Sequence, residues 1–160
     1  MTSTHTNQTV ISADADVPIV RIVREFDAPP TKVFKAHVDP ELLVRWLGPS
    51  RHETHVDYWD ARTGGSFRYV MSSGGNEFGF RGSFHEVRPS ELIVQTMTFE
   101  GEPDGVALER LVLEDLGGGR TRLTSTSLVD SFESRDAWVA SGMESGVVEG
   151  YERLDALITD

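Results

Sequence analysis

The histidines are the first side chains in this sequence to test for metal or acid-base chemistry. His52 and His55 flank Glu53 in a segment with strand character, but residues at this spacing on a strand point to opposite faces and cannot ligate one ion. His37 and His85 have no carboxylate or histidine at a ligand spacing. We therefore expect surface histidines, and the sequence predicts no metal site.

The remaining reactive side chains form no recognisable catalytic pattern. A glycine run at 117–119 is followed by Arg120 and Thr121, without a lysine or a helix. This order is typical of a flexible hairpin and not of a phosphate-binding loop. No serine lies in a nucleophile-elbow pattern, and no triad or carboxylate pair is evident. The catalytic residues are therefore unknown from the sequence, and no cofactor is expected.

Large apolar side chains recur on one face of the predicted strands and of the C-terminal helix. Strand alternation places on common faces Phe67, Tyr69 and Met71, then Phe80 and Phe84, then Met97 and Phe99, and finally Leu111 and Leu113. Helical spacing aligns Met143, Val147 and Tyr151. These residues either fill a solid core or line a cavity, and Trp46 either closes one end of that cavity or anchors its helix. Tyr69 and Tyr151 would supply the polar contacts, whereas Arg81 alternates toward solvent.

The elements that carry these side chains begin with a strand and two short helices. A strand at 19–26 ends before Pro29 and Pro30, which remove two backbone donors. Pro30 opens the first helix, and Asp39 followed by Pro40 opens the second as N-cap and first helical residue. Both helices therefore lie between the first and second strands.

Six further strands are predicted between residues 52 and 128, separated by short turns rich in Gly, Pro, Asn and Asp. Short connections make successive strands antiparallel neighbours. One long amphipathic helix is then predicted from an N-cap at Ser134 to Ile158, since no proline interrupts it. We predict an α+β domain in which a curved seven-stranded antiparallel sheet wraps around this helix.

Length, charge and cysteine content restrict the class of protein. The 160 residues include 15 Lys and Arg against 26 Asp and Glu, a net charge of −11, and no cysteine. Disulfides and thiol chemistry are excluded, and the acid excess disfavours nucleic-acid or membrane partners. Residues 1–16 are polar and without apolar periodicity, so we expect a disordered tail before a single domain at 17–160. We expect a cytoplasmic location.

The sequence resembles the START-like (SRPBCC) superfamily with its helix-grip fold, and within it the branch named after the activator of Hsp90 ATPase. The resemblance covers residues 18 to 158 and is carried by Phe26-Asp27-Ala28-Pro29, Asp39-Pro40-Glu41-Leu42-Leu43, Trp46-Leu47-Gly48-Pro49, Gly64-Gly65, Phe67-Arg68-Tyr69-Val70-Met71, Phe80-Arg81-Gly82, Ser141-Gly142-Met143-Glu144-Ser145-Gly146 and Tyr151-Glu152-Arg153-Leu154.

This resemblance implies an apolar cavity between the sheet and the C-terminal helix that binds a small hydrophobic or amphipathic molecule. The ligand-binding residues predicted on this basis are Trp46, Phe67, Tyr69, Met71, Phe80, Phe84, Met97, Phe99, Leu111, Met143, Val147 and Tyr151. An alternative is a cyclase, dehydratase or hydrolase that uses the same cavity, and another is a chaperone-interacting module. We do not expect chaperone binding, because the tail is too short for the N-terminal chaperone-binding domain of the eukaryotic activator. The oligomeric state stays open, a homodimer included.

Three glycines at 142, 146 and 150 border the apolar stripe of the predicted long helix. Glycine weakens a helix interior by about 0.8 to 1 kcal/mol relative to alanine. We expect Gly150 either to let strand backbone approach the helix or to leave room for a ligand.

Overall fold

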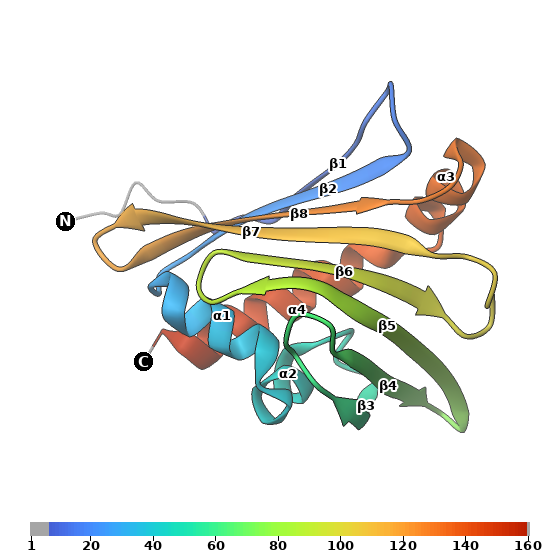
Figure 1. Ribbon diagram of the computed structural model, residues 1–160, viewed down its shortest axis with the longest axis horizontal. Helices are drawn as coiled ribbons and strands as arrows, with labels where there is room; N and C mark the ends of the chain where they lie inside the picture. Colours follow the sequence, from blue (N-terminus) through green and yellow to red (C-terminus); the bar gives the residue numbers. More distant parts are fainter. Residues whose placement is uncertain (1–6, 160) are drawn as a thin grey trace.

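A computed structural model of the protein describes residues 7–159 and contains a single eight-stranded antiparallel sheet (Figure 1). The strand order is β1-β2-β8-β7-β6-β5-β4-β3. The strands are β1 (Val10–Ala13), β2 (Ile19–Phe26), β3 (Glu53–Trp59), β4 (Ser66–Ser73), β5 (Asn76–Arg88), β6 (Leu92–Phe99), β7 (Ala107–Gly117) and β8 (Arg120–Leu128). The predicted α+β class and the meander from β3 to β8 are confirmed. The first long strand, β2, extends this meander by pairing with β8, from Ile19 opposite Leu128 to Phe26 opposite Thr121, and β3 is the opposite edge of the sheet.

The strand β1 is the difference from the predicted seven strands. It pairs with β2 from Val10 opposite Val23 to Ala13 opposite Val20, so the prediction of a disordered tail is wrong for these residues. Its four residues, three of them apolar, are too few to show a period, and the pairing depends on the free edge of β2. Residues 1–6 of the predicted tail lie outside the described part of the chain.

The β1–β2 turn is held by hydrogen bonds from a residue that is distant in the sequence. Arg135, which is only 6% exposed, donates from Nη1 to the carbonyl oxygens of Asp14 and Ile19 at 2.8 and 3.0 Å. Nothing local in the first sixteen residues could reveal this contact, because its donor lies in the C-terminal part of the chain.

The two predicted short helices are α1 (Pro30–Val38) and α2 (Pro40–Trp46). Proline occupies the first turn of each, where no helical hydrogen bond is lost. The Asp39 side chain accepts a hydrogen bond from the Glu41 backbone N–H at 2.9 Å, which confirms its role as the N-cap of α2.

The long C-terminal helix is in fact two helices, α3 (Phe132–Ala140) and α4 (Met143–Ile158). The break falls at Gly142, whose φ of +88° is left-handed, and the backbone N–H of Ser141 bonds to the Trp138 carbonyl. A left-handed glycine commonly ends a helix without any proline. The predicted N-cap is also shifted, since Ser131 accepts from the Ser134 backbone N–H at 3.0 Å.

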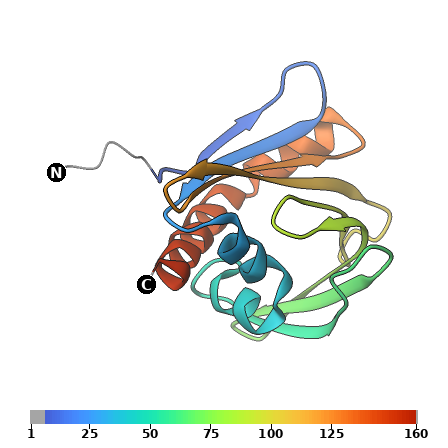
Figure 2. The same ribbon diagram turned by 60° about the vertical axis from the view of Figure 1, so that its left-hand side comes forward.

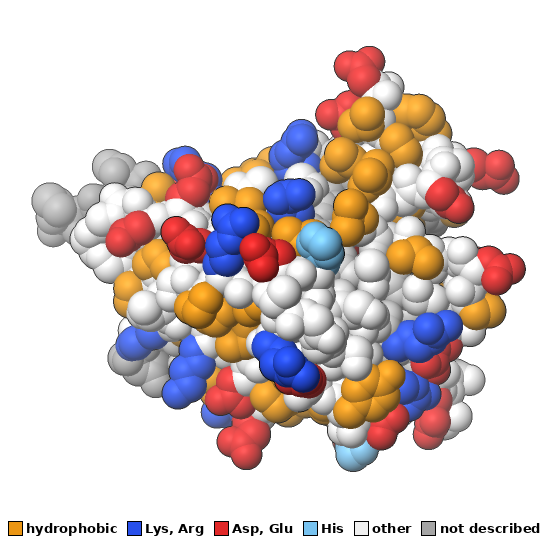
Figure 3. All heavy atoms as spheres, in the orientation of Figure 1, with side chains coloured by type: hydrophobic (Ala, Val, Ile, Leu, Met, Phe, Trp, Pro, Cys, Tyr) orange, Lys and Arg blue, Asp and Glu red, His pale blue; other side chains and the backbone are white. Residues whose placement is uncertain are grey.

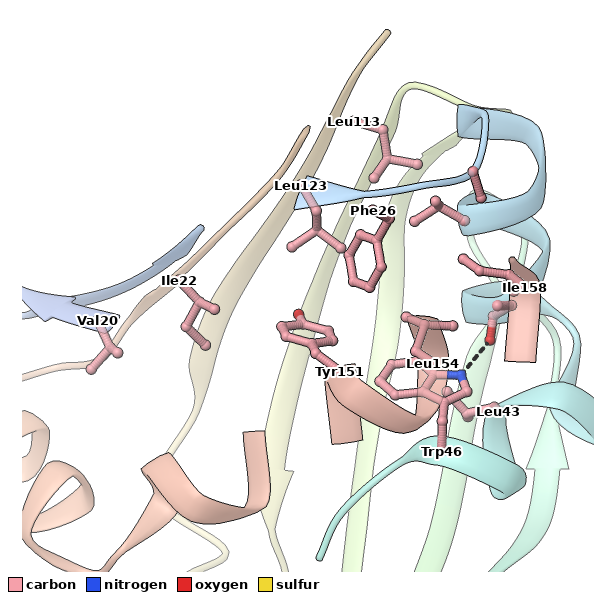
Figure 4. Packing of buried hydrophobic residues seen from close by; sticks show 13 residues of the cluster. Val20, Ile22, Phe26, Leu43, Trp46, Leu113, Leu123, Tyr151, Leu154 and Ile158 are labelled. Carbon is pink, nitrogen blue, oxygen red and sulfur yellow. Dashed lines mark hydrogen bonds between the residues drawn. The ribbon is translucent and has the colours of Figure 1, made fainter. Parts of the chain in front are cut away.

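The sheet curves around α4, and α1 and α2 cover the end of that helix nearest the C-terminus (Figures 1 and 2). The interior holds two clusters of buried apolar residues. One joins β2, β7 and β8 to α1, α2 and α4 around Phe26, Leu123 and Leu154, which are fully buried (Figure 4). The other joins β4, β5 and β6 around Phe67 and Phe84. Leu111 of β7 packs against both.

Candidate functional site

Several of the predicted ligand-binding residues belong to the closed core. Phe67 and Phe84 are 0% and 2% exposed, and their ring centroids lie 5.2 Å apart. Both also contact the ring of Trp59, whose indole N–H donates to the Val38 carbonyl at 2.8 Å. These two phenylalanines therefore fix β4 against β5, and the structure gives them the role of core residues.

Trp46 and Tyr151 join α2 to α4. Their rings stack at 5.9 Å with 24° between the planes, and the Trp46 indole N–H donates to the Ala36 carbonyl at 2.9 Å. Phe26 meets the other side of Tyr151 edge-on at 5.6 Å. Trp46 is thus an anchor of its helix. The Tyr151 hydroxyl points away from α4, toward the strands that carry Ile22 and Leu123 (Figure 4).

A second group of predicted residues faces the interior yet keeps partial exposure to solvent. Leu111 and Met97 lie on the inward face of β7 and β6, and Met143 and Val147 lie on the first turns of α4. Met71 and Phe80 complete this half-buried set. Phe99 is 37% exposed, and its ring lies 5.4 Å from the Phe80 ring. The side chains around Leu154 are therefore more completely buried than those around Leu111.

Three polar side chains stand in one row across the inward face of the sheet. Gln95 of β6 is opposite Glu109 of β7, which is opposite Ser127 of β8. Gln95 Nε2 donates to Glu109 Oε1 at 3.1 Å, and Ser127 Oγ donates to Glu109 Oε2 at 2.9 Å. We call Gln95, Glu109 and Ser127 the polar row.

Glu109 is the charged member of the polar row and lies deep in the domain. Burial raises the pKa of its carboxyl, while the hydrogen bonds from Ser127 and Gln95 act in the opposite direction. No ion pair joins Glu109 to a cation within residues 7–159. The residue is nevertheless half-buried and not fully sealed from solvent.

Two tyrosine hydroxyls lie in the electrostatic field of Glu109. Burial and the Glu109 charge together raise the pKa of both Tyr69 and Tyr151 above the ordinary value of 10. The two residues are only 6% and 8% exposed, and neither hydroxyl has a hydrogen-bond partner in the described part of the chain. Neither oxygen is among the fully shielded atoms that lack a partner, so each keeps contact with accessible space. Tyr69 comes from the sheet and Tyr151 from α4.

The polar row was missed in the sequence analysis, although a signal for it existed. Glu109 alternates with Leu111 and Leu113, which were assigned to the inward face. A charged residue at that position interrupts an apolar pattern, and such an interruption marks a buried polar group. The partners Gln95 and Ser127 could not be found in the same way, because they depend on the register of three strands.

The histidines differ from the predicted surface positions in two cases. His55 and His85 are exposed, but His37 is half-buried under Trp46 with the ring centroids 4.9 Å apart. Its Nδ1 lies 2.7 Å from the Val33 carbonyl, Nε2 has no partner, and burial lowers its pKa to about 4. His52 is also half-buried. Among residues 7–159, no three Asp, Glu or His side chains are grouped closely enough to hold a metal ion.

Two surface hollows are present away from these residues. One of about 390 Å³ is bordered by the 102–105 loop with Asp130 and Ser134, and one of about 350 Å³ by the 72–75 turn with Arg51 and Glu53. Neither is lined by a predicted ligand-binding residue.

The outer surface carries charges of both signs. On the face shown in Figure 3, Lys and Arg side chains lie among Asp and Glu side chains. Within the described residues, no helix has the length and apolar content that crossing a membrane would require.

Comparison with known proteins gives a consistent result. Residues 27–159 match the family described as activator of Hsp90 ATPase homolog 1-like protein. A protein of Arthrobacter aurescens, solved by NMR, is 28% identical with a TM-score of 0.85, over 94% of this chain and 91% of that one. A Chromobacterium violaceum protein is 27% identical with a TM-score of 0.78, over 89% and 98%. No curated protein matches the chain.

One further structure resembles this chain in fold alone. DynU16, described as a putative protein in the dynemicin biosynthetic locus, is 23% identical with a TM-score of 0.64. The similarity covers 87% of this chain and 46% of DynU16, so this chain spans about half of that protein.

Proposed function

The chain belongs to the family of activator of Hsp90 ATPase homolog 1-like proteins, and we propose that it binds a small hydrophobic or amphipathic molecule between the sheet and α4. The observation that carries this proposal is the half-buried set of inward-facing side chains around Leu111. Leu111, Met97 and Val147 face the centre of the domain, yet they are not sealed as Phe26, Leu123 and Leu154 are.

Partial exposure of apolar side chains inside a domain has an energetic consequence. Each square ångström of apolar surface that a bound molecule removes from water stabilises the complex by about 25 cal/mol. An apolar molecule that covers Leu111, Met97 and Val147 would gain this stabilisation without a large change of the sheet. Small-molecule sites are commonly apolar with a few convergent polar groups. Glu109, Tyr69 and Tyr151 would be those groups.

Turnover is not part of this proposal. A general acid or base works best with a pKa near the operating pH. The pKa values of Tyr69 and Tyr151 are raised away from neutrality, and neither hydroxyl has a proton-accepting partner among residues 7–159. We also do not propose that the protein activates a chaperone.

We propose the cytoplasm as the compartment, because the chain has no cysteine.

The test measures binding of Nile red, a neutral apolar dye, to purified protein. Replacement of Leu111 by Trp would fill the half-buried space, and we expect at least about tenfold weaker dye binding. Leu116→Trp, on the same strand but 37% exposed, is the matched control and should bind as the wild type does. Mass spectrometry of solvent extracts of the purified protein would identify a retained molecule. Equal dye binding by wild type and Leu111→Trp would refute the proposed site.

A further inference from the structure

The charge of Glu109 is not balanced by the described part of the protein. Each of its oxygens accepts one hydrogen bond, and both donors, Gln95 and Ser127, are neutral. The inward neighbours along β7 are Ala107 and Leu111, which carry no charge. The buried guanidinium of Arg24 is engaged by Asp155 at 3.1 Å.

An unpaired carboxylate in this position is unfavourable. Transfer of an ion from water to a protein interior costs several kcal/mol unless an opposite charge or sufficient hydrogen bonds compensate. Gln95 and Ser127 compensate in part, and they also fix the direction of the carboxylate. A bound cation would supply the missing charge.

The surroundings of Glu109 suit an organic cation better than a hydrated metal ion. The site lacks the further carboxylates that a metal would require. It offers the hydroxyl oxygens of Tyr69 and Tyr151 instead, and the rings that carry them are held in place by stacking on Phe80 and Trp46. Hydroxyl oxygens accept hydrogen bonds from alkylammonium groups.

We propose that the molecule bound between the sheet and α4 is a hydrophobic amine whose protonated nitrogen pairs with Glu109. This inference rests on the proposed function and specifies its ligand class. The alkyl or aromatic body of the amine covers Leu111, Met97 and Val147, and the ammonium group reaches the polar row. The hydroxyl oxygens of Tyr69 and Tyr151 are free to accept hydrogen bonds from it. A fatty acid would instead place a second carboxylate beside Glu109, where like charges repel.

The test compares decylammonium, decanol and decanoate, which share one alkyl chain and differ in the charge of the head group. At neutral pH we expect calorimetry to show decylammonium binding about tenfold more tightly than decanol, and decanoate most weakly. Glu109→Gln keeps the shape of the side chain and removes its charge. In this variant the advantage of decylammonium over decanol should vanish.

The control must account for the overall negative charge, which attracts any cation. Glu114→Gln changes the net charge by the same amount at an exposed position on the same strand, and should leave the order of affinities unchanged. If Glu109→Gln does not fold, the wild type at about 1 M salt still decides the matter, because screening within about 3 Å removes diffuse attraction but not an enclosed ion pair.

The outcomes separate this inference from the proposed function. Equal binding of the three molecules, or an unchanged order in Glu109→Gln, would overturn the amine and leave an apolar site. Loss of the decylammonium advantage at high salt would do the same. Failure of all three molecules to bind would overturn the proposed function and the inference with it.

Discussion

Gly150 of α4 lies against the end of α2 so closely that a Cβ atom on it would be 3.0 Å from the backbone oxygen of Trp46. The same carbonyl accepts a hydrogen bond from Arg153 Nη2 at 2.9 Å, and Arg153 also donates to the Gly48 carbonyl. Glycine at 150 therefore allows α4 to lie this close to the end of α2. The sequence analysis offered two expectations for Gly150, namely room for a ligand or close approach of a strand. The structure shows neither, because the backbone next to Gly150 belongs to the end of α2.

Alanine at Gly150 is predicted to destabilise the domain. The added methyl group gains about 1 kcal/mol of helix propensity but forces α2 and α4 apart, and overpacking typically costs about 1 to 3 kcal/mol. We expect a net loss of about 1 kcal/mol in urea unfolding. Gly146→Ala is the matched control, since its Cβ would come no closer than 3.4 Å to Pro49, an ordinary contact, and it should stabilise α4. A stabilised Gly150→Ala would contradict the contact.

Removal of the tyrosine hydroxyls is predicted to leave stability almost unchanged. Tyr69→Phe and Tyr151→Phe break no hydrogen bond to the described residues, so we expect changes within about 0.5 kcal/mol. Binding of decylammonium should weaken about three- to tenfold in each variant. Thr121→Val is the contrasting variant, because the buried Thr121 hydroxyl donates to the Ala28 carbonyl at 2.7 Å. Loss of this hydrogen bond should lower the free energy of unfolding by about 1 to 2 kcal/mol. If Tyr69→Phe, Tyr151→Phe and Thr121→Val were equally destabilised, the two tyrosine hydroxyls would not be free of hydrogen bonds.

Glu109→Gln is predicted to stabilise the unliganded protein at neutral pH. The folded-state pKa of Glu109 lies above its ordinary value of 4.5, so as the pH rises the unfolded chain loses this proton first and stability falls. Each pKa unit of difference is worth about 1.4 kcal/mol. The stability that Glu109→Gln gains over the wild type should therefore increase as the pH rises from 4.5 and decrease below that pH. Parallel stability curves for wild type and variant would show that Glu109 titrates normally.

His37 is predicted to weaken the fold in mild acid. Its folded-state pKa of about 4 lies below the ordinary 6.5, so the unfolded chain binds the proton first and stability is lost as the pH falls from 6.5 to about 4. Because the ring is partly exposed to solvent, we expect the free energy of unfolding to fall by only about 2 kcal/mol over this range. His37→Gln should remove this part of the acid sensitivity, and His85→Gln, at an exposed position, should not. Identical acid titrations of the two variants would count against the buried ring.

The sequence supported the fold much better than the site. Proline at the first turn of α1 and α2, the Asp39 cap and the turns between β3 and β8 act over a few residues, and each was predicted correctly. The strand β1 and the contacts of Arg135 depend on segments far apart in the chain, so no local pattern contains them. Gly142 is a different case, because a glycine can continue a helix or end it in the left-handed conformation, and the sequence did not indicate which of the two occurs.

In the candidate site, too, local patterns were predictable and features that depend on tertiary packing were not. Alternation placed Tyr69, Met97 and Leu111 inward correctly, but it could not separate the sealed Phe67 from the half-buried Leu111. That difference arises from how far α4 covers each strand. The polar row likewise exists only because three strands align Gln95, Glu109 and Ser127.

The pairing of β2 with β8 determines when the sheet can close during synthesis. Ile19 meets Leu128, so β2 leaves the ribosome long before the strand that covers its inner edge. Until then β1 alone is available to pair with it, and α1 and α2 have no α4 to pack against. Sheets held by contacts between such distant residues fold slowly, and their exposed edges favour aggregation. The meander from β3 to β7 is therefore expected to form first, with closure of the β2–β8 seam as the late step of folding.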